Sequence, residues 1–142
     1  MKVGEFLQAS RQHLVTCIPD HALNDVAKLM YSNGIGALPV CELNDRMVGI
    51  VSERDYARKV VLLGRSSTDT RVADIMTSKV ITVIPQQDVH DCMRLMTDKR
   101  IRHLPVMHGD RVIGILSIGD LVRAVIEEQE RTIADLESYI RS

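Results

Sequence analysis

Two matching stretches of this sequence decide its fold: Gly49-Ile50-Val51-Ser52-Glu53-Arg54-Asp55 and Gly114-Ile115-Leu116-Ser117-Ile118-Gly119-Asp120. Each begins as a buried strand, then offers a hydroxyl and, three residues later, a carboxylate where an amphipathic helix should start. Because a helix N-terminus presents unpaired N–H groups and a partial positive charge, this position suits a phosphate. A carboxylate beside it can accept hydrogen bonds from both hydroxyls of a ribose.

The same residues also have a purely structural interpretation. In a capping box, the Ser side chain accepts from a backbone N–H of the first helical turn, while the Asp side chain reaches back to a free N–H. Taken alone, the Ser-x-x-Asp spacing leaves both interpretations open.

The two stretches belong to an internal repeat. A shift of 66 residues lays Thr16-Cys17-Ile18-Pro19 on Thr82-Val83-Ile84-Pro85, and residues 35–40 on residues 101–106. After a one-residue deletion the shift becomes 65, and the two stretches then align with each other. Self-similarity at a fixed offset indicates two copies of one structural unit. We predict a first repeat at residues 3–66, a second at 67–130 and a helical extension at 131–142.

Each repeat has the pattern of a β-α-β-β-α unit. The predicted strands span residues 14–18, 37–42 and 47–51 in the first repeat, and 80–84, 103–107 and 112–116 in the second. A closing helix is expected from about residue 53 to 63, and from about residue 118 onward in the second copy. Three strands with helices on one side leave the other sheet face uncovered. We therefore predict an α/β (α+β) fold in which the two units pack sheet to sheet about a pseudo-twofold axis.

The C-terminal helix runs past its counterpart in the first repeat. Apolar and neutral residues recur there at spacings of three and four, as in a short heptad seam: Ile126, Gln129, Ile133, Leu136 and Ile140. This seam could pack on its own domain or pair with a second copy of the chain. The apolar run at residues 60–63 also exceeds what one helix face can bury. Together these features predict a homodimer.

The composition, with 45% hydrophobic and 26% charged residues, is that of a globular protein. A net charge of -1 gives no reason to expect nucleic acid as a partner. No apolar run approaches the roughly 20 residues of a membrane span, and the N-terminal residues lack an apolar signal region. We therefore expect a cytoplasmic protein without a membrane partner.

The sequence lacks the usual signs of catalysis or metal binding. It has no P-loop, and its five histidines have no metal-ligand spacing. Cys17, Cys41 and Cys92 align with apolar residues of the other repeat, which predicts small buried hydrophobes. Because no nucleophile or base has an activating neighbour, we do not expect an enzyme.

The repeat resembles a tandem pair of CBS domains, the module named for cystathionine β-synthase. The resemblance rests on Leu38-Pro39-Val40 and Leu104-Pro105-Val106, each in register with its Gly-to-Asp stretch, and covers about residues 3–130. It implies a regulatory module that binds adenine nucleotides such as AMP, ADP, ATP or NAD in clefts between the repeats and signals to a protein effector. With nothing attached, the chain resembles the stand-alone bacterial type.

The resemblance also implies which residues form each cleft. Asp55 and Asp120 match the position that binds the ribose hydroxyls, and Ser52 and Ser117 match the hydroxyl on the phosphate side. The first cleft would combine Ile50, Ser52 and Asp55 with Thr77, Val80 and Ile101; the second would combine Ile115, Ser117 and Asp120 with His13, Ile35 and Gly36.

The two clefts are expected to differ in charge. Arg102 and His103 precede Leu-Pro-Val in the second repeat, and we predict that they contact the ligand. Arg54, Arg58 and Lys59 follow the first motif and are candidate phosphate contacts, although Arg58 and Lys59 could equally form a solvated face. Two hypotheses remain: an adenine-nucleotide sensor, and a scaffold of the same fold without a physiological ligand. Retention of both aspartates favours the sensor.

Overall fold

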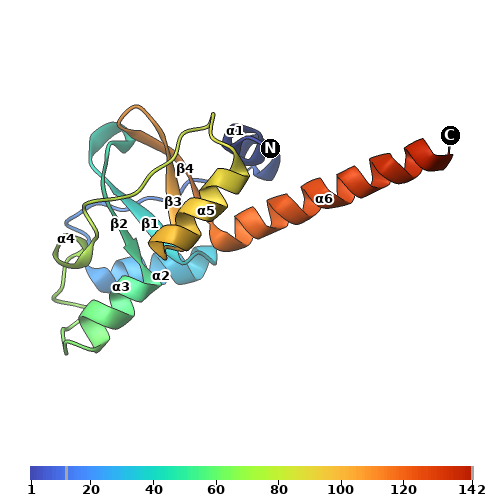
Figure 1. The fold of residues 1–142 in the computed structure, drawn as a ribbon. Helices are drawn as coiled ribbons and strands as arrows, with labels where there is room; N and C mark the ends of the chain where they lie inside the picture. Colours follow the sequence, from blue (N-terminus) through green and yellow to red (C-terminus); the bar gives the residue numbers. More distant parts are fainter. Residues whose placement is uncertain (12, 142) are drawn as a thin grey trace.

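The computed structural model describes residues 1–11 and 13–141, which form two similar units (Figure 1). The first unit contains α2 (Leu23–Asn33), β1 (Ala37–Cys41), β2 (Met47–Ser52) and α3 (Glu53–Asp55). The second contains α5 (Val89–Lys99), β3 (His103–His108), β4 (Arg111–Ser117) and α6 (Ile118–Arg141). Two short helices precede the units, α1 (Val3–Ser10) and α4 (Val72–Ile75). The predicted α/β (α+β) fold with two repeats and a long C-terminal helix is confirmed.

An antiparallel hairpin forms the centre of each unit. In the first hairpin Leu38 pairs with Val51, and in the second Leu104 pairs with Leu116. All four side chains are fully buried. Both hairpins shift register directly after the valine of Leu-Pro-Val, so the two copies share the same irregularity. The Leu-Pro-Val motif therefore supplies the core-facing strand of each repeat.

The strand predicted at the start of each repeat is reduced to one pairing residue. Cys17 forms a parallel bridge with Val40, and Val83 forms the same bridge with Val106. The expected three-stranded sheets are thus two-stranded sheets with a single bridging residue at one edge. A proline two residues after each bridge has no N–H to donate, which prevents the pairing from extending.

The closing helix of the first repeat is also irregular. The sequence predicts one helix over residues 53–63, but α3 is a single turn that continues as a π-helix, η2 (Tyr56–Val61). Val60 is buried there, whereas Val61, Leu62 and Leu63 are 65%, 76% and 69% exposed. The apolar run is therefore mostly on the surface, as its sequence predicts. π-helical turns occur frequently beside functional sites, and this one directly follows the first motif.

The two short leading helices are exchanged between the repeats. Val3 of α1 is fully buried in the core of the second repeat, while Val72 and Ile75 of α4 are buried in the core of the first. Burying each of these side chains contributes about 1.5–3 kcal/mol. Because each core is completed by the segment that precedes the other repeat, the two repeats form one folding unit. The boundaries at residues 66 and 130 stay a prediction.

The three cysteines are buried, which confirms their predicted role as small core residues. Cys17, Cys41 and Cys92 are 2%, 3% and 0% exposed and form no disulfide. Burial raises the pKa of Cys17 to about 12 and the pKa of both Cys41 and Cys92 to about 11. These thiols therefore stay protonated at neutral pH, and none is an activated nucleophile.

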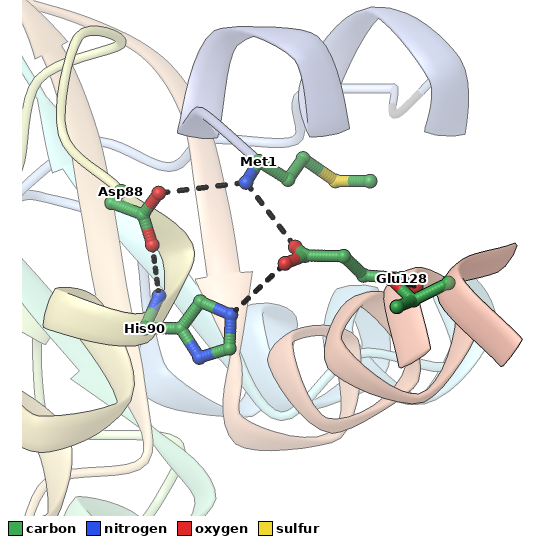
Figure 2. Close-up of polar contacts among 5 residues, drawn as sticks. Met1, Asp88, His90 and Glu128 are labelled. Carbon is green, nitrogen blue, oxygen red and sulfur yellow. Dashed lines mark hydrogen bonds and ion pairs between the residues drawn. The ribbon is translucent and has the colours of Figure 1, made fainter. Parts of the chain in front are cut away.

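Helix α6 extends away from the rest of the molecule (Figure 1). Its Glu128 carboxylate accepts a hydrogen bond from the Met1 amino group at 3.2 Å and lies 3.3 Å from His90 Nε2 (Figure 2). Asp88 lies 3.4 Å from the same amino group, so these contacts hold α6 against the start of α5. Residues 129–141 are all exposed. Among residues 1–11 and 13–141, no helix is both long and apolar enough for a membrane span.

Candidate functional site

A cavity of about 590 Å³ lies between the two repeats. Its walls are the end of β2 with the following helical turns, the segment that leads into the second repeat, and the turn between α5 and β3. The lining residues are Gly36, Ile50, Ser52, Glu53, Arg54, Asp55, Arg58, Thr77, Lys79, Val80, Ile81, Arg100, Ile101, Arg102 and His103. All six residues predicted for the first cleft are among them.

One wall of the cavity is a backbone edge. Ile50 and Thr77 exchange two backbone hydrogen bonds, of 3.0 and 2.9 Å, which hold the leading segment of the second repeat beside β2. The next residues, 78–82, make no backbone hydrogen bond to any other residue in the part of the chain that the structure describes. Since Lys79, Val80 and Ile81 line the cavity, their N–H and C=O groups are available to a ligand.

The carboxylate of the first motif is fixed by a capping box. Ser52 N donates to Asp55 Oδ2 at 3.0 Å, and Asp55 N donates to Ser52 Oγ at 3.2 Å. The other oxygen, Oδ1, lies 3.6 Å from Lys59 Nζ, and the Asp55 side chain is 17% exposed. The capping and the binding interpretations are compatible here, because the box orients a carboxylate that also forms part of the cavity wall.

The cavity wall carries a positive charge excess. Five cationic side chains line it against two carboxylates: Arg54, Arg58, Lys79, Arg100 and Arg102. Sequence reasoning named three of these and missed Lys79 and Arg100. An excess of guanidinium groups around a cavity favours an anionic ligand, because Arg offers a rigid fork of donors to phosphate or carboxylate oxygens.

Lys59, predicted as a candidate phosphate contact, does not line this cavity. Its Nζ donates to the carbonyl oxygen of Ile75 at 2.7 Å and lies 3.6 Å from Asp55. Lys59 therefore links the π-helix to α4 and forms an ion pair with the Asp55 carboxylate.

His103 connects the cavity with the second motif. Its ring lies 3.5 Å from the position that a Cβ would occupy on Gly36. Burial lowers the pKa of His103, with a further lowering from Arg102, while Asp120 and Glu53 oppose the shift. The ring is thus neutral at pH 7, and its pKa is influenced by carboxylates of both repeats.

The second motif repeats the capping box of the first. Ser117 N donates to Asp120 Oδ2 at 3.0 Å, and Asp120 N donates to Ser117 Oγ at 3.1 Å. Here, however, the second carboxylate oxygen of Asp120 pairs directly with Arg123. The other residues predicted for this cleft have different surroundings: Ile35 packs against the first core, Gly36 lines the first cavity, His13 is exposed, and Ile115 is half-buried in β4. Their grouping into a second cleft stays a prediction.

Comparison with known proteins places the chain in a family. The CBS domain profile matches it twice, at residues 3–62 and 72–127. The mitochondrial CBS domain-containing protein CBSX3 of Arabidopsis thaliana is 45% identical over 129 residues, which cover 88% of this chain and 63% of the plant protein. The chain therefore spans less than two thirds of that relative.

Two solved structures are also similar to the chain. A protein with CBS domains from Burkholderia ambifaria has a TM-score of 0.84 and 50% identity, with 91% of this chain and 96% of that chain covered. The hexameric CBS-CP12 protein from bloom-forming cyanobacteria has a TM-score of 0.76 and 30% identity, with 86% and 69% covered. The two family matches together cover most of the chain, so the chain belongs to the CBS domain family and contains two CBS domains in tandem.

Proposed function

We propose that this protein is a regulatory module that binds an adenine nucleotide in the cavity between its repeats and signals the bound state to a partner protein. CBS-domain proteins are generally regulatory, ligand-binding modules, which gives the coarse function. The single observation that carries the finer proposal is the composition of the cavity of about 590 Å³. It combines a fixed carboxylate, an unpaired backbone edge and five cations, which suit a ribose, a base and phosphates respectively.

The proposed orientation follows from these three features. Adenine presents an acceptor next to a donor, which matches the alternating N–H and C=O groups of residues 78–82. Asp55 accepts from the ribose hydroxyls, and Ser52 lies at the helix start, where N–H groups favour a phosphate. Arg100 and Arg102 lie in the facing wall and bind further phosphate oxygens.

The alternative is a scaffold of the same fold without a physiological nucleotide. The capping boxes favour it, because they give Asp55 and Asp120 a structural role that needs no ligand. The positive charge excess of the cavity favours the sensor, because among the residues that the structure describes none of these five cations pairs with a carboxylate, and such cations serve no packing purpose.

Adenine nucleotides are expected to stabilise the protein and guanine nucleotides to do so less. At a hundredfold excess over the dissociation constant, binding should add about 2.7 kcal/mol to the free energy of unfolding and raise the melting temperature accordingly. A thermal melt with AMP, ADP, ATP, NAD and GMP measures this directly. Equal shifts of the melting temperature with AMP and GMP would contradict selectivity for adenine. If no nucleotide shifted the melting temperature, the scaffold without a nucleotide would be the remaining function.

We also propose a homodimer in which α6 pairs with α6 of a second copy. Ile126, Ile133 and Leu136 are 48%, 55% and 57% exposed on a helix that extends beyond the rest of the molecule (Figure 1). In heptad terms, Ile occupies the a positions 126, 133 and 140, and Leu136 a d position, which is the pattern of parallel two-stranded coiled coils. The exposed residues 61–63 would add a second contact beside the repeats.

Truncation after Glu128 tests the contribution of α6 to this dimer. Removing residues 129–142 should shift the chain from dimer towards monomer in light scattering at micromolar concentration, because the seam from Gln129 onward is lost. The melting temperature at concentrations where both forms are monomeric should not change, since every removed residue that the structure describes is exposed and Glu128 keeps its contacts. A full-length monomer at micromolar concentration would refute the dimer.

A further inference from the structure

The two repeats differ in charge at three positions that line the cavity. At each of these positions one repeat has an arginine that lines the first cleft, and the aligned position of the other repeat has a glycine. The pairs are Arg54 with Gly119 at an offset of 65, and Arg100 with Gly34 and Arg102 with Gly36 at an offset of 66. The pseudo-twofold symmetry of the fold is therefore strongly broken in charge, and all three arginines fall on the cavity of the first motif.

Arg100 occupies a backbone conformation that L-residues rarely adopt. It ends α5 in the left-handed region, with φ 54° and ψ 44°, where the equivalent end of α2 uses Gly34 with φ 62° and ψ 36°. Glycine is the usual residue at such a helix end, because a Cβ is disfavoured there. At this helix end the second repeat thus carries backbone strain that the first avoids. Strain of this kind is concentrated at sites where the side chain has a function.

The three arginines line both the main cavity and a second hollow. A groove of about 320 Å³ is lined by Arg54, Arg100 and Arg102, together with Met96 and Thr97 at the end of α5. Arg54 Nη1 donates to the carbonyl oxygen of Arg100 at 3.3 Å, which links the two repeats at this point. Within the described part of the chain, none of the three arginines forms an ion pair with a carboxylate.

We propose that these three arginines, which we call the arginine bridge, make the first cleft selective for nucleotides with two or more phosphates. The proposal rests on the proposed function, because Asp55 and the backbone edge must first hold the nucleoside. The first phosphate then lies at Ser52, and only the following ones reach the bridge and the groove beyond it. Each additional phosphate gains charge-assisted hydrogen bonds from guanidinium groups that have no carboxylate partner. Affinity therefore rises in the order AMP, ADP, ATP.

Arg100→Gly separates binding from folding, because it removes the side chain and relieves the backbone strain together. In calorimetric titrations without magnesium, the variant should bind ATP about ten- to a hundredfold more weakly than the wild type, while its AMP affinity changes less than about threefold. Its melting temperature without ligand should rise by a few degrees. Arg100→Lys keeps the charge but not the guanidinium fork, so its ATP affinity should lie between the two.

Arg94→Ala is the matched control. Arg94 lies on α5, is 78% exposed and pairs with Asp91, so the variant loses the same charge away from the cavity. It should bind ATP and AMP like the wild type. Equal wild-type affinities for AMP and ATP, or an unchanged ATP-to-AMP ratio in Arg100→Gly, would overturn the arginine bridge and leave the proposed function intact.

The failure of the proposed function has a different signature. If no adenine nucleotide binds the wild type, that function fails. In that case, binding of inorganic tripolyphosphate to the wild type and to Arg100→Gly tests the arginine bridge. Binding to the wild type that Arg100→Gly loses would support the bridge, and absence of binding to the wild type would overturn it as well.

Discussion

Asp55→Asn should weaken adenine nucleotide binding about ten- to a hundredfold while the protein without ligand melts close to the wild-type temperature. The carboxylate contributes charge-assisted hydrogen bonds to the ribose, each of which contributes roughly 1.5–3 kcal/mol. Asparagine offers one neutral acceptor and a donor in the same place. It can still accept from Ser52 N, as Asp55 Oδ2 does at 3.0 Å, so the cap is retained. Loss of the partly exposed contact with Lys59 costs about 1 kcal/mol or less.

The equivalent variant of the second motif is the matched control. Asp120 has the same capping box and the same 17% exposure, but Arg123 already occupies its other oxygen. Asp120→Asn should therefore leave the affinity of the first cleft unchanged, and it should affect binding only at a second, weaker site. Calorimetry on both single variants and the double variant decides between binding and capping. Wild-type affinity in the double variant, or a large loss of stability without ligand, would assign both aspartates to capping alone.

Gly49→Ala should destabilise the fold and disturb the cavity at once. A Cβ on Gly49 would lie 2.7 Å from Met76 Sδ and 2.9 Å from the carbonyl oxygen of Thr77. The methionine can move, but the Thr77 backbone is held by its hydrogen bonds to Ile50. Forcing an extra methyl group into such a contact costs about 1–3 kcal/mol, which corresponds to a melting temperature lower by several degrees. Nucleotide affinity should fall as well, because the displaced segment forms one wall of the cavity.

Gly119→Ala provides the comparison for this substitution. Gly119 lies in the first turn of α6, and a Cβ there would meet only Ser117 Oγ, at an ordinary distance of 3.7 Å. This variant should melt at or slightly above the wild-type temperature, since alanine favours a helix by up to about 1 kcal/mol over glycine. Chemical denaturation of both variants gives the two free energies. Equal stability of Gly49→Ala and wild type would show that the close approach is not a constraint.

Local sequence patterns predicted the strands of both hairpins, and the six residues that the family resemblance implied for the first cleft line one cavity. Leu-Pro-Val and the start of the Gly-to-Asp stretch are short apolar runs with turn residues between them, which is the pattern of a hairpin, and the structure pairs Leu38 with Val51. Ser52 and Asp55 lie together for the same reason, because a three-residue spacing at a helix start brings their side chains into contact. Because the two repeats align, the same hairpin and the same Ser–Asp contact are expected in the second copy.

Other features depend on contacts that no local pattern encodes. Val3 and Val72 have similar surroundings in the sequence, so nothing in either segment reveals that each completes the core of the other repeat. Arg100 was missed because a left-handed helix end predicts glycine, and an arginine there gives no turn signal. The aligned Gly34 was the available clue: it marks the position as left-handed in one copy, so the arginine in the other copy stands out once the two turns are compared.

A crystal structure of the protein grown with ATP would show whether the cavity between the repeats binds an adenine nucleotide. We expect the adenine against the backbone of residues 78–82, the ribose hydroxyls on Asp55, and the terminal phosphates on Arg100 and Arg102. Nucleotide bound at another surface, or a cavity that holds only solvent at a saturating ATP concentration, would contradict nucleotide binding in this cavity.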